Sequence, residues 1–341
     1  MNDRTIQLGD YAIKPGTRRK VDLPVADLYT QTELTIPIHV INGRRDGPTL
    51  FLTAAVHGDE LNGVEIIRRL LGMTALRKMR GCLIAAPIVN VYGFIYRSRY
   101  LPDRRDLNRS FPGRETGSAA SRLAYLVSSE IISKANYGID LHTGSADRAN
   151  LPQIRGDLSN AEVLRLARVF GTPVIINSNI RDGSLREAAS ANDIPLLLYE
   201  AGEASRFDEL SIRAGVRGIL RVMRVLGMLP DRKPRIAQID PVISHSTTWV
   251  RAPRSGIVLT ACALGQRVSK GDVLARISDP FGEVEESVVA TVSGLVIGCS
   301  QLPLAHEGEA LYHIARFANN SEAEATVEEF QQAQMQHENP R

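Results

Sequence analysis

The fold of this chain is decided by the stretch LFLTAAVHGDE at residues 50–60. Its first seven residues are apolar or small and follow a Gly-Pro pair, which predicts a buried β-strand. Residues 61–71 then carry apolar side chains at the spacing of one helix face. His57 and Glu60 are therefore expected at a turn from a strand to a helix, where open α/β sheets bind their ligands.

A second histidine is expected at the end of a later strand. Residues 137–142 read YGIDLH, with Asp140 and His142 near the end of the apolar run. His57, Glu60 and His142 supply two imidazoles and one carboxylate, a ligand set with which catalytic zinc sites keep a fourth position open for water or substrate. Asp140 would orient the His142 ring through its other nitrogen. The alternative interpretation is an ordinary histidine beside a strand-end cap.

Composition narrows the class of protein. A length of 341 residues favours two domains, and 43% hydrophobic residues with 23% charged residues is typical of a globular protein. The net charge of +3 is too small to indicate nucleic acid or an anionic membrane as a partner. The three cysteines are scattered and form no disulfide framework. Without a signal core or a transmembrane-length apolar run, a cytoplasmic protein is expected.

Residues 1–229 are predicted to form one α/β domain, with a mostly parallel mixed sheet flanked by helices. The segment 5–43 is β-rich, and apolar strands then alternate with amphipathic helices up to residue 228. The expected strands are 82–86, 137–141, 173–177 and 194–199, and the expected helices are 61–74, 119–134, 159–170, 184–192 and 209–228.

The composition changes after this domain. A polar, proline-bounded linker is expected over 230–243, and a β-rich domain over 244–317. The remaining residues, 318–341, form a polar tail that is either helical or disordered.

An internal repeat in the β-rich region predicts a small β-barrel or a sandwich. Residues 252–258 resemble 290–296, and residues 271–277 resemble 308–314. Two copies of one strand-turn-strand unit resemble the biotinyl/lipoyl hammerhead barrel. Carrier versions of that barrel modify a lysine in the hairpin between the halves, and the hairpin at 279–283 has none. A cofactor-carrying arm is therefore not expected.

Two further segments suggest substrate chemistry. Asn108 and Arg109 lie in a long, arginine-rich connection, and an arginine fork with an adjacent amide suits capture of a carboxylate. Glu200 ends a fully apolar strand and is the preferred general base, because the strand fixes its direction. Glu203, in the loop that follows, is the competing candidate.

With these segments, the chain resembles the succinylglutamate desuccinylase/aspartoacylase family of zinc carboxypeptidase-like amidohydrolases, over roughly residues 35–316. The resemblance implies one zinc ion per chain. It assigns the residues as follows: His57, Glu60 and His142 as zinc ligands, Glu200 as base, and Asn108 and Arg109 as the site for a substrate carboxylate. It also implies an arginine that polarises the scissile carbonyl, for which Arg99 is the nearest match and Arg104 and Arg105 are alternatives.

The expected function is that of a zinc-dependent amidohydrolase that deacylates an N-acylated amino acid or a similar small amide bearing a carboxylate. A metallocarboxypeptidase acting on peptides is one alternative, and a non-catalytic binding module is another. The sequence leaves open the acyl group, the amine, the role of the C-terminal domain and the oligomeric state, including a homo-oligomer.

Overall fold

The computed structural model describes residues 4–231 and 239–335. The strands of the N-terminal part are β1 (Ile6–Leu8), β2 (Tyr11–Ile13), β3 (Thr17–Asp27), β4 (Glu33–Asn42), β5 (Arg45–Ala54), β6 (Arg80–Ala86), β7 (Tyr137–His142), β8 (Arg148–Gly156), β9 (Val174–Asn177) and β10 (Leu196–Glu203). The α-helices are α1 (Asn62–Leu71), α2 (Val91–Tyr96), α3 (Ala119–Glu130), α4 (Ala161–Phe170), α5 (Leu185–Ser190) and α6 (Glu209–Val225). Short 3-10 helices are η1 (Thr74–Lys78), η2 (Leu107–Arg109) and η3 (Ile132–Lys134).

The C-terminal part is mostly β-structure. Its strands are β11 (Val242–Ser244), β12 (Ser246–Arg251), β13 (Gly256–Thr260), β14 (Arg267–Val268), β15 (Val273–Ser278), β16 (Glu285–Val289), β17 (Gly294–Ser300), β18 (Leu304–Ala305) and β19 (Ala310–Arg316). One helix, α7 (Asn320–Met335), follows them.

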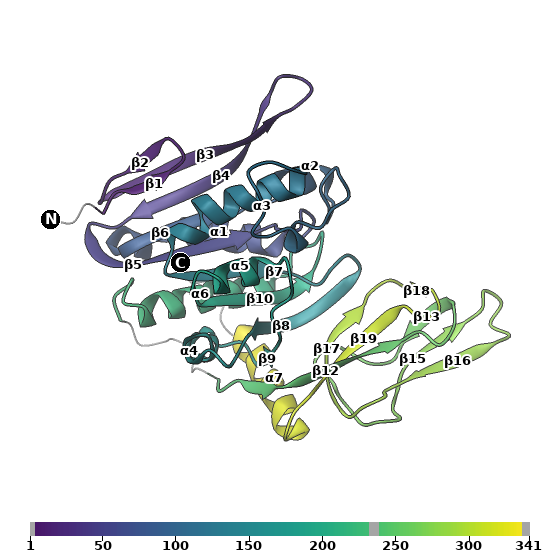
Figure 1. Cartoon of the computed structure of the whole chain (residues 1–341). Coiled ribbons are helices and arrows are strands. Elements are labelled where there is room, and N and C mark those ends of the chain that lie inside the picture. The colour runs from purple at the N-terminus through teal and green to yellow at the C-terminus, as the bar shows by residue number, and fades with distance from the viewer. Residues whose placement is uncertain (1–3, 232–238, 336–341) are drawn as a thin grey trace.

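One large mixed sheet runs through both parts of the molecule (Figure 1). Its strands follow the order β12-β19-β17-β8-β10-β7-β5-β6-β4-β3, with β9, β11 and β14 paired beside this path. The central strands β6, β5, β7 and β10 are parallel, whereas β4 pairs antiparallel with β6 and β8 pairs antiparallel with β10. The predicted mixed sheet flanked by helices is confirmed. Beside its centre, β9 pairs in parallel with β8 and β11, whereas β3 and β4 on one side and β17, β19 and β12 on the other pair antiparallel.

The helices cover both faces of the central strands. Leu50 and Leu52 of β5 pack in one core with residues of α1, α4 and α6. Phe51, between them, belongs to the opposite core, to which α3 and α5 contribute. Because side chains alternate along a strand, Thr53 also points to the α3/α5 face. The ends of the parallel strands present their polar side chains to that face.

Helices α4 and α6 approach each other closely at a glycine. A Cβ atom added at Gly218 of α6 would lie 2.3 Å from the Phe170 ring of α4. Phe170 is almost completely buried and also packs against Tyr199 of β10, at 5.0 Å between ring centroids. The absence of a side chain at residue 218 therefore lets two helices pack tightly on one face of the sheet.

The C-terminal strands are divided between two sheets. Strands β12, β19 and β17 extend the large sheet, and β16, β15, β13 and β18 form a four-stranded sheet. Buried residues such as Leu274, Ile277 and Ile314 fill one core in this region. The β-rich character is as predicted, whereas the closed barrel and the proposed domain limits stay predictions.

The segments that flank this region also have structure. Within the linker predicted at 230–243, residues 232–238 lie outside the described residues, and β11 pairs in parallel with β9. The tail predicted at 318–341 contains α7, which buries Ala323, Val327 and Phe330. Residues 336–341 lie outside the described part.

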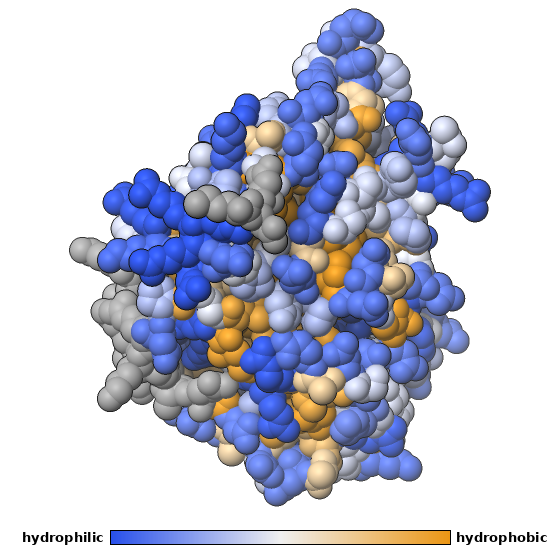
Figure 2. Space-filling view, turned by 60° about the vertical axis from the view of Figure 1, so that its left-hand side comes forward, coloured by the Kyte–Doolittle hydropathy of each residue, from blue (hydrophilic) through white to orange (hydrophobic). Residues whose placement is uncertain are grey.

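Among the described residues, no helix combines the length and apolar character needed to cross a bilayer. The face shown in Figure 2 is covered mainly by hydrophilic side chains, with apolar side chains in smaller patches between them.

Candidate metal centre and active site

The expected metal ligands meet at the ends of two neighbouring parallel strands. His57 and Glu60 lie in the loop between β5 and α1, and His142 is the last residue of β7. The loop passes so close to α2 that a Cβ atom at Gly58 would lie 1.9 Å from the backbone of Gly93. Glycine at residue 58 therefore lets the loop that carries His57 and Glu60 pack directly against α2.

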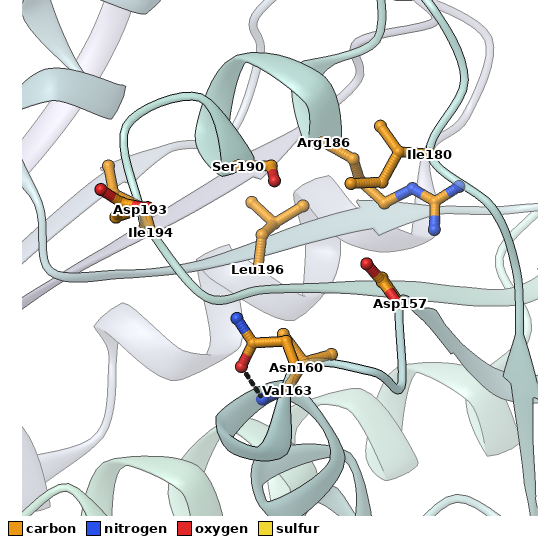
Figure 3. A pocket seen from close by; sticks show the side chains of 9 residues that line it. All are labelled: Asp157, Asn160, Val163, Ile180, Arg186, Ser190, Asp193, Ile194 and Leu196. Carbon is orange, nitrogen blue, oxygen red and sulfur yellow. Dashed lines mark hydrogen bonds between the residues drawn. The ribbon is translucent and has the colours of Figure 1, made fainter.

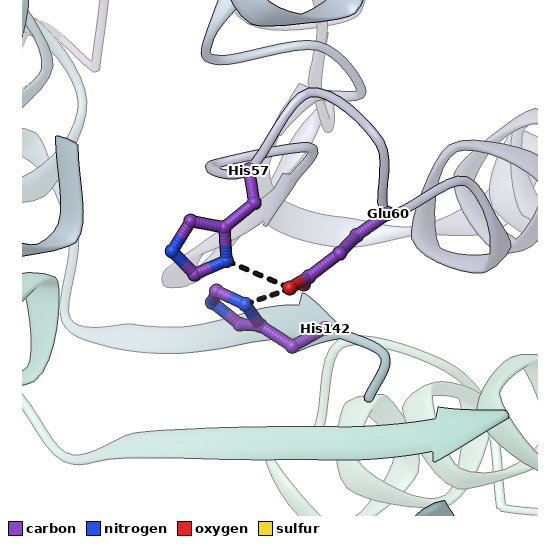
Figure 4. Close-up of side chains that lie close together, drawn as sticks. All are labelled: His57, Glu60 and His142. Atoms are coloured by element: carbon purple, nitrogen blue, oxygen red, sulfur yellow. Dashed lines mark hydrogen bonds and ion pairs between the residues drawn. The ribbon is translucent and has the colours of Figure 1, made fainter. Parts of the chain in front are cut away.

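His57, Glu60 and His142 form a buried, convergent donor set (Figure 4). One donor atom from each residue lies within 4.8 Å of the others. The Nδ1 atoms of His57 and His142 each lie 2.8 Å from a different Glu60 oxygen. Two ring nitrogens and a carboxylate at such distances fit a zinc ion.

The Nε2 atom of each imidazole, on the side of the ring away from Glu60, contacts an aspartate carboxylate. His142 Nε2 lies 2.7 Å from Asp140 Oδ2, and His57 Nε2 lies 3.2 Å from Asp106 Oδ1. Thr53 donates a 2.7 Å hydrogen bond to the other Asp140 oxygen. An Nε2–H that donates to an aspartate leaves the Nδ1 lone pair for the centre of the cluster, as in many histidine metal sites.

The electrostatics of the cluster favour positive charge. Burial lowers the pKa of His57, but Glu60 and Asp106 outweigh burial and the pKa is raised. Burial also opposes protonation of His142, yet Asp140 and Glu60 hold its pKa well above the usual value. The pKa of Glu60 is lowered in spite of its burial, because both imidazoles face it. A divalent cation at this position would replace the protons on His57 and His142 and supply the positive charge instead.

Arg99 lies at the edge of the cluster. Its Nη2 is 2.9 Å from Asp106 Oδ2, and its Nη1 is 3.6 Å from Glu60 Oε1. Arg105 is instead 3.8 Å from Asp103, and the side chain of Arg104 is exposed. Of the three arginines considered from sequence, the structure brings Arg99 to the cluster.

Glu200 stands beside His142 on the next strand. The parallel register of β10 and β7 pairs these two residues directly. The Oε2 atom of Glu200 accepts a 2.8 Å hydrogen bond from Asn150 Nδ2 and lies 3.2 Å from Arg155 Nε. Glu203 is farther along β10, and its carboxylate lies 3.5 Å from Arg206. The geometry therefore supports Glu200 over Glu203 as a group that could work with the cluster.

Asn108 and Arg109 follow Asp106 in η2. Asn108 Oδ1 accepts a 2.9 Å hydrogen bond from the backbone N–H of Leu185, at the start of α5. Arg109 is exposed and donates to the backbone oxygen of Asn108. Burial of part of its side chain lowers the pKa of Arg109, and the nearby Arg181 and Arg99 act in the same direction. This places several cations at one edge of the site, while the substrate role of the pair stays a prediction.

Asp106, Asn150 and Arg155 are site residues to which the sequence pattern assigned no role. Asp106 belongs to the same short motif as Asn108 and Arg109, so its position in the sequence was a usable signal. Asn150 and Arg155 lie on β8, a strand that the hydrophobic pattern did not predict.

A cavity of about 210 Å³ lies apart from the cluster (Figure 3). It is lined by Asp157, Asn160, Val163, Ile180, Arg186, Ser190, Asp193, Ile194 and Leu196. The guanidinium of Arg186 is already bonded to Ser178 Oγ at 2.8 Å and to the backbone oxygen of Asn179 at 2.9 Å. None of the site residues expected from sequence lines this cavity.

Residues 46–226, just over half of the chain, match the succinylglutamate desuccinylase/aspartoacylase catalytic domain. The protein is thus a hydrolase that acts on carbon–nitrogen bonds. It belongs to the succinylglutamate desuccinylase/aspartoacylase family, as the resemblance of its motifs implied.

Known relatives agree with this assignment. An N-alpha-acetyl-L-2,4-diaminobutyric acid deacetylase from Halomonas elongata is 27% identical over 254 residues, which cover 72% of this chain and 74% of that protein. The product-bound structure of the ectoine utilization protein EutE (DoeB) from Ruegeria pomeroyi has a TM-score of 0.79 and 25% identity, covering 88% of this chain and 94% of that chain. A succinylglutamate desuccinylase structure from Silicibacter sp. has a TM-score of 0.81 at 24% identity, covering 93% of this chain and all of that chain (100%), and shows the shared fold.

Proposed function

We propose that the protein is a zinc-dependent deacylase of N-acyl amino acids or similar small amides that carry a carboxylate. The observation that carries this proposal is the convergence of His57, Glu60 and His142, with Glu200 beside them on the adjacent strand. Membership of a deacylase family supports the reaction class, and the donor set supports the metal.

The three ligands would hold one zinc ion, which lowers the pKa of a bound water toward about 7 and polarises a carbonyl oxygen. Glu200 would accept a proton from the attacking water and deliver it to the departing amine nitrogen. Since Asn150 and Arg155 both engage Oε2, Oε1 is the atom of Glu200 that we assign to proton transfer. The chain thereby provides a base whose orientation is fixed before the substrate arrives.

Two groups of polar side chains would position the substrate. Arg99, next to Glu60, would stabilise negative charge on the carbonyl oxygen, a contribution whose loss lowers turnover by roughly 10²–10³-fold in other hydrolases. Arg109 would bind the carboxylate of the substrate through its guanidinium. Asn108 would assist from Nδ2, because its Oδ1 already accepts from Leu185. These contacts would set the register of the scissile bond.

The substrate class follows from the family and from the relatives. The Halomonas relative is named as a deacetylase of an N-acetylated amino acid, and the family name refers to N-succinyl and N-acyl amino acids. We therefore propose a panel of Nα-acetyl-L-2,4-diaminobutyrate, N-acetyl-L-aspartate and N-succinyl-L-glutamate as first substrates, with release of the free amine as the readout. Peptides with a free C-terminus in the same panel test for carboxypeptidase activity.

The test of the base is Glu200→Gln, with Glu203→Gln as the matched control on the same strand. We expect the first variant to keep its zinc, measured by elemental analysis, and to lose about 10²-fold or more in kcat. The control should keep both. Undiminished turnover by zinc-loaded Glu200→Gln would remove Glu200 from the mechanism.

A further inference from the structure

Strand β8 supplies both contacts that hold Glu200. Asn150 and Arg155 reach the same oxygen, Oε2, at 2.8 Å and 3.2 Å. The Arg155–Glu200 pair is largely shielded from water, with side chains only 16% and 18% exposed. An ion pair and a hydrogen bond to one oxygen restrict rotation of a carboxylate more than either contact alone.

The C-terminal region contacts each of these two residues. Gly298 of β17 pairs with Asn150, and a Cβ atom at Gly298 would lie 2.7 Å from Asn150 Oδ1. His313 of β19 places its Nδ1 3.5 Å from Arg155 Nη2. Two different strands of the C-terminal region therefore reach the two side chains that hold Glu200.

His313 is fixed in turn by a stacked aromatic pair. Its ring lies parallel to that of Trp249 on β12, with 4.3 Å between centroids and 5° between planes. The guanidinium of Arg148 lies over the Trp249 ring at 5.6 Å. The histidine is buried, with 3% of its surface exposed, so its ring has little freedom to move away from Arg155.

The chemical state of His313 suits this contact. Burial first, and then the charges of Arg155 and Arg181, lower its pKa to about 3. A neutral imidazole can accept from the Arg155 guanidinium, whereas an imidazolium would repel it.

We infer that the C-terminal region acts as a positioning element for the catalytic base. His313 orients the guanidinium of Arg155, and Gly298 leaves room for the side chain of Asn150. These two β8 side chains in turn hold the carboxylate of Glu200 in place. This inference rests on the proposed role of Glu200. Neither His313 nor Gly298 needs to touch the substrate, so each is a positioning residue rather than a catalytic one.

The test compares three variants of the full-length, zinc-loaded protein. His313→Phe keeps a stacked ring and removes the acceptor, and His313→Gln returns an acceptor oxygen. His306→Phe is the matched control, since it replaces an exposed histidine of the same region. Kinetics are measured on whichever compound of the substrate panel releases amine fastest, beside wild type and Glu200→Gln, with zinc content and circular dichroism recorded for every protein.

For His313→Phe we expect kcat to fall about 10-fold while KM stays within about twofold and zinc content is unchanged, because misorientation of a reacting group affects turnover more than binding. His313→Gln should recover most of the lost kcat, and His306→Phe should match wild type. If His313→Phe is not folded, Gly298→Ala tests the same inference through Asn150, with the same expected loss in kcat.

Two results would overturn this inference alone. One is an unchanged kcat in folded His313→Phe while Glu200→Gln is inactive, which would leave the base assignment standing without this support. The other is a raised KM with an unchanged kcat, which would make His313 a substrate-binding residue. Full turnover by Glu200→Gln would instead end the base assignment and the inference together.

Discussion

Burial of His313 as a neutral imidazole makes the stability of this protein sensitive to acid. Its ring is enclosed by Trp249, and the charged groups that face it or its partner are Arg155, Arg181 and Arg148. Burial and the two arginines each lower the pKa of His313, and no carboxylate is among the causes of the shift. Protonation of His313 in the folded state is therefore opposed by all of these effects. The folded protein therefore resists taking up this proton, whereas the unfolded chain does not.

The magnitude follows from the two pKa values. The folded value is about 3 and the unfolded reference is 6.5. As the pH falls below 6.5, the unfolded chain binds a proton that the folded protein refuses until the pH nears 3, so stability is lost across that window. Between pH 6 and pH 4 the loss from this one residue is about 2.5 kcal/mol, and its contribution stops changing once the pH is about one unit above the reference value of 6.5.

The assay is urea unfolding of wild type, His313→Phe and the exposed-site control His306→Phe at both pH values. The chain has a single tryptophan, so its fluorescence reports on the ring stacked against His313. We expect the free energy of unfolding of wild type, relative to His313→Phe, to decrease by about 2.5 kcal/mol between pH 6 and pH 4. A difference that stays constant would show that His313 takes up its proton equally well in both states and would refute the reasoning.

Two further predictions concern the metal and the core. Asp106→Asn and Asp140→Asn should each weaken zinc binding by about 10–100-fold, because each aspartate orients an imidazole. Competition with a chelator measures the zinc affinity. An equal affinity in wild type and Asp106→Asn would contradict this prediction. Gly218→Ala should destabilise the protein by about 1–3 kcal/mol, because its Cβ would collide with the Phe170 ring. Thermal unfolding measures the loss, with Gly72→Ala as the control, since a Cβ there would meet nothing closer than 3.4 Å. Equal stability of the two variants would show that α4 and α6 adjust without strain.

The convergence of His57, Glu60 and His142, the expected metal ligands, was predictable because strand ends in a parallel sheet lie at one edge. The hydrophobic runs before His57 and His142 identify both strands, and the polar residues at their ends follow from the pattern. Glu200 was predictable for the same reason, and its register with His142 is what two neighbouring parallel strands produce.

The parts that sequence did not predict depend on pairing between distant segments. Pro152, Gln153 and Arg155 interrupt the hydrophobic pattern of strand β8. Gln153 pairs directly with Glu200 of β10, and Arg155 points to the same face of the sheet. Asn150 and Arg155, the partners of Glu200, were not predicted because they lie on this strand. Asp106 was part of a recognised motif, but only the folded loop brings its carboxylate against His57.

The hydrogen bonds between β17 and β8 have a consequence for engineering. Because Gly298, Cys299 and Ser300 pair with Asn150, Ala149 and Arg148, the two regions share one continuous sheet. A chimaera that exchanges only the C-terminal region between two relatives would have to reproduce this strand register. Otherwise it would leave an open sheet edge next to the residues that hold Glu200. Chimaeras of this protein are thus best designed with both regions treated as one unit.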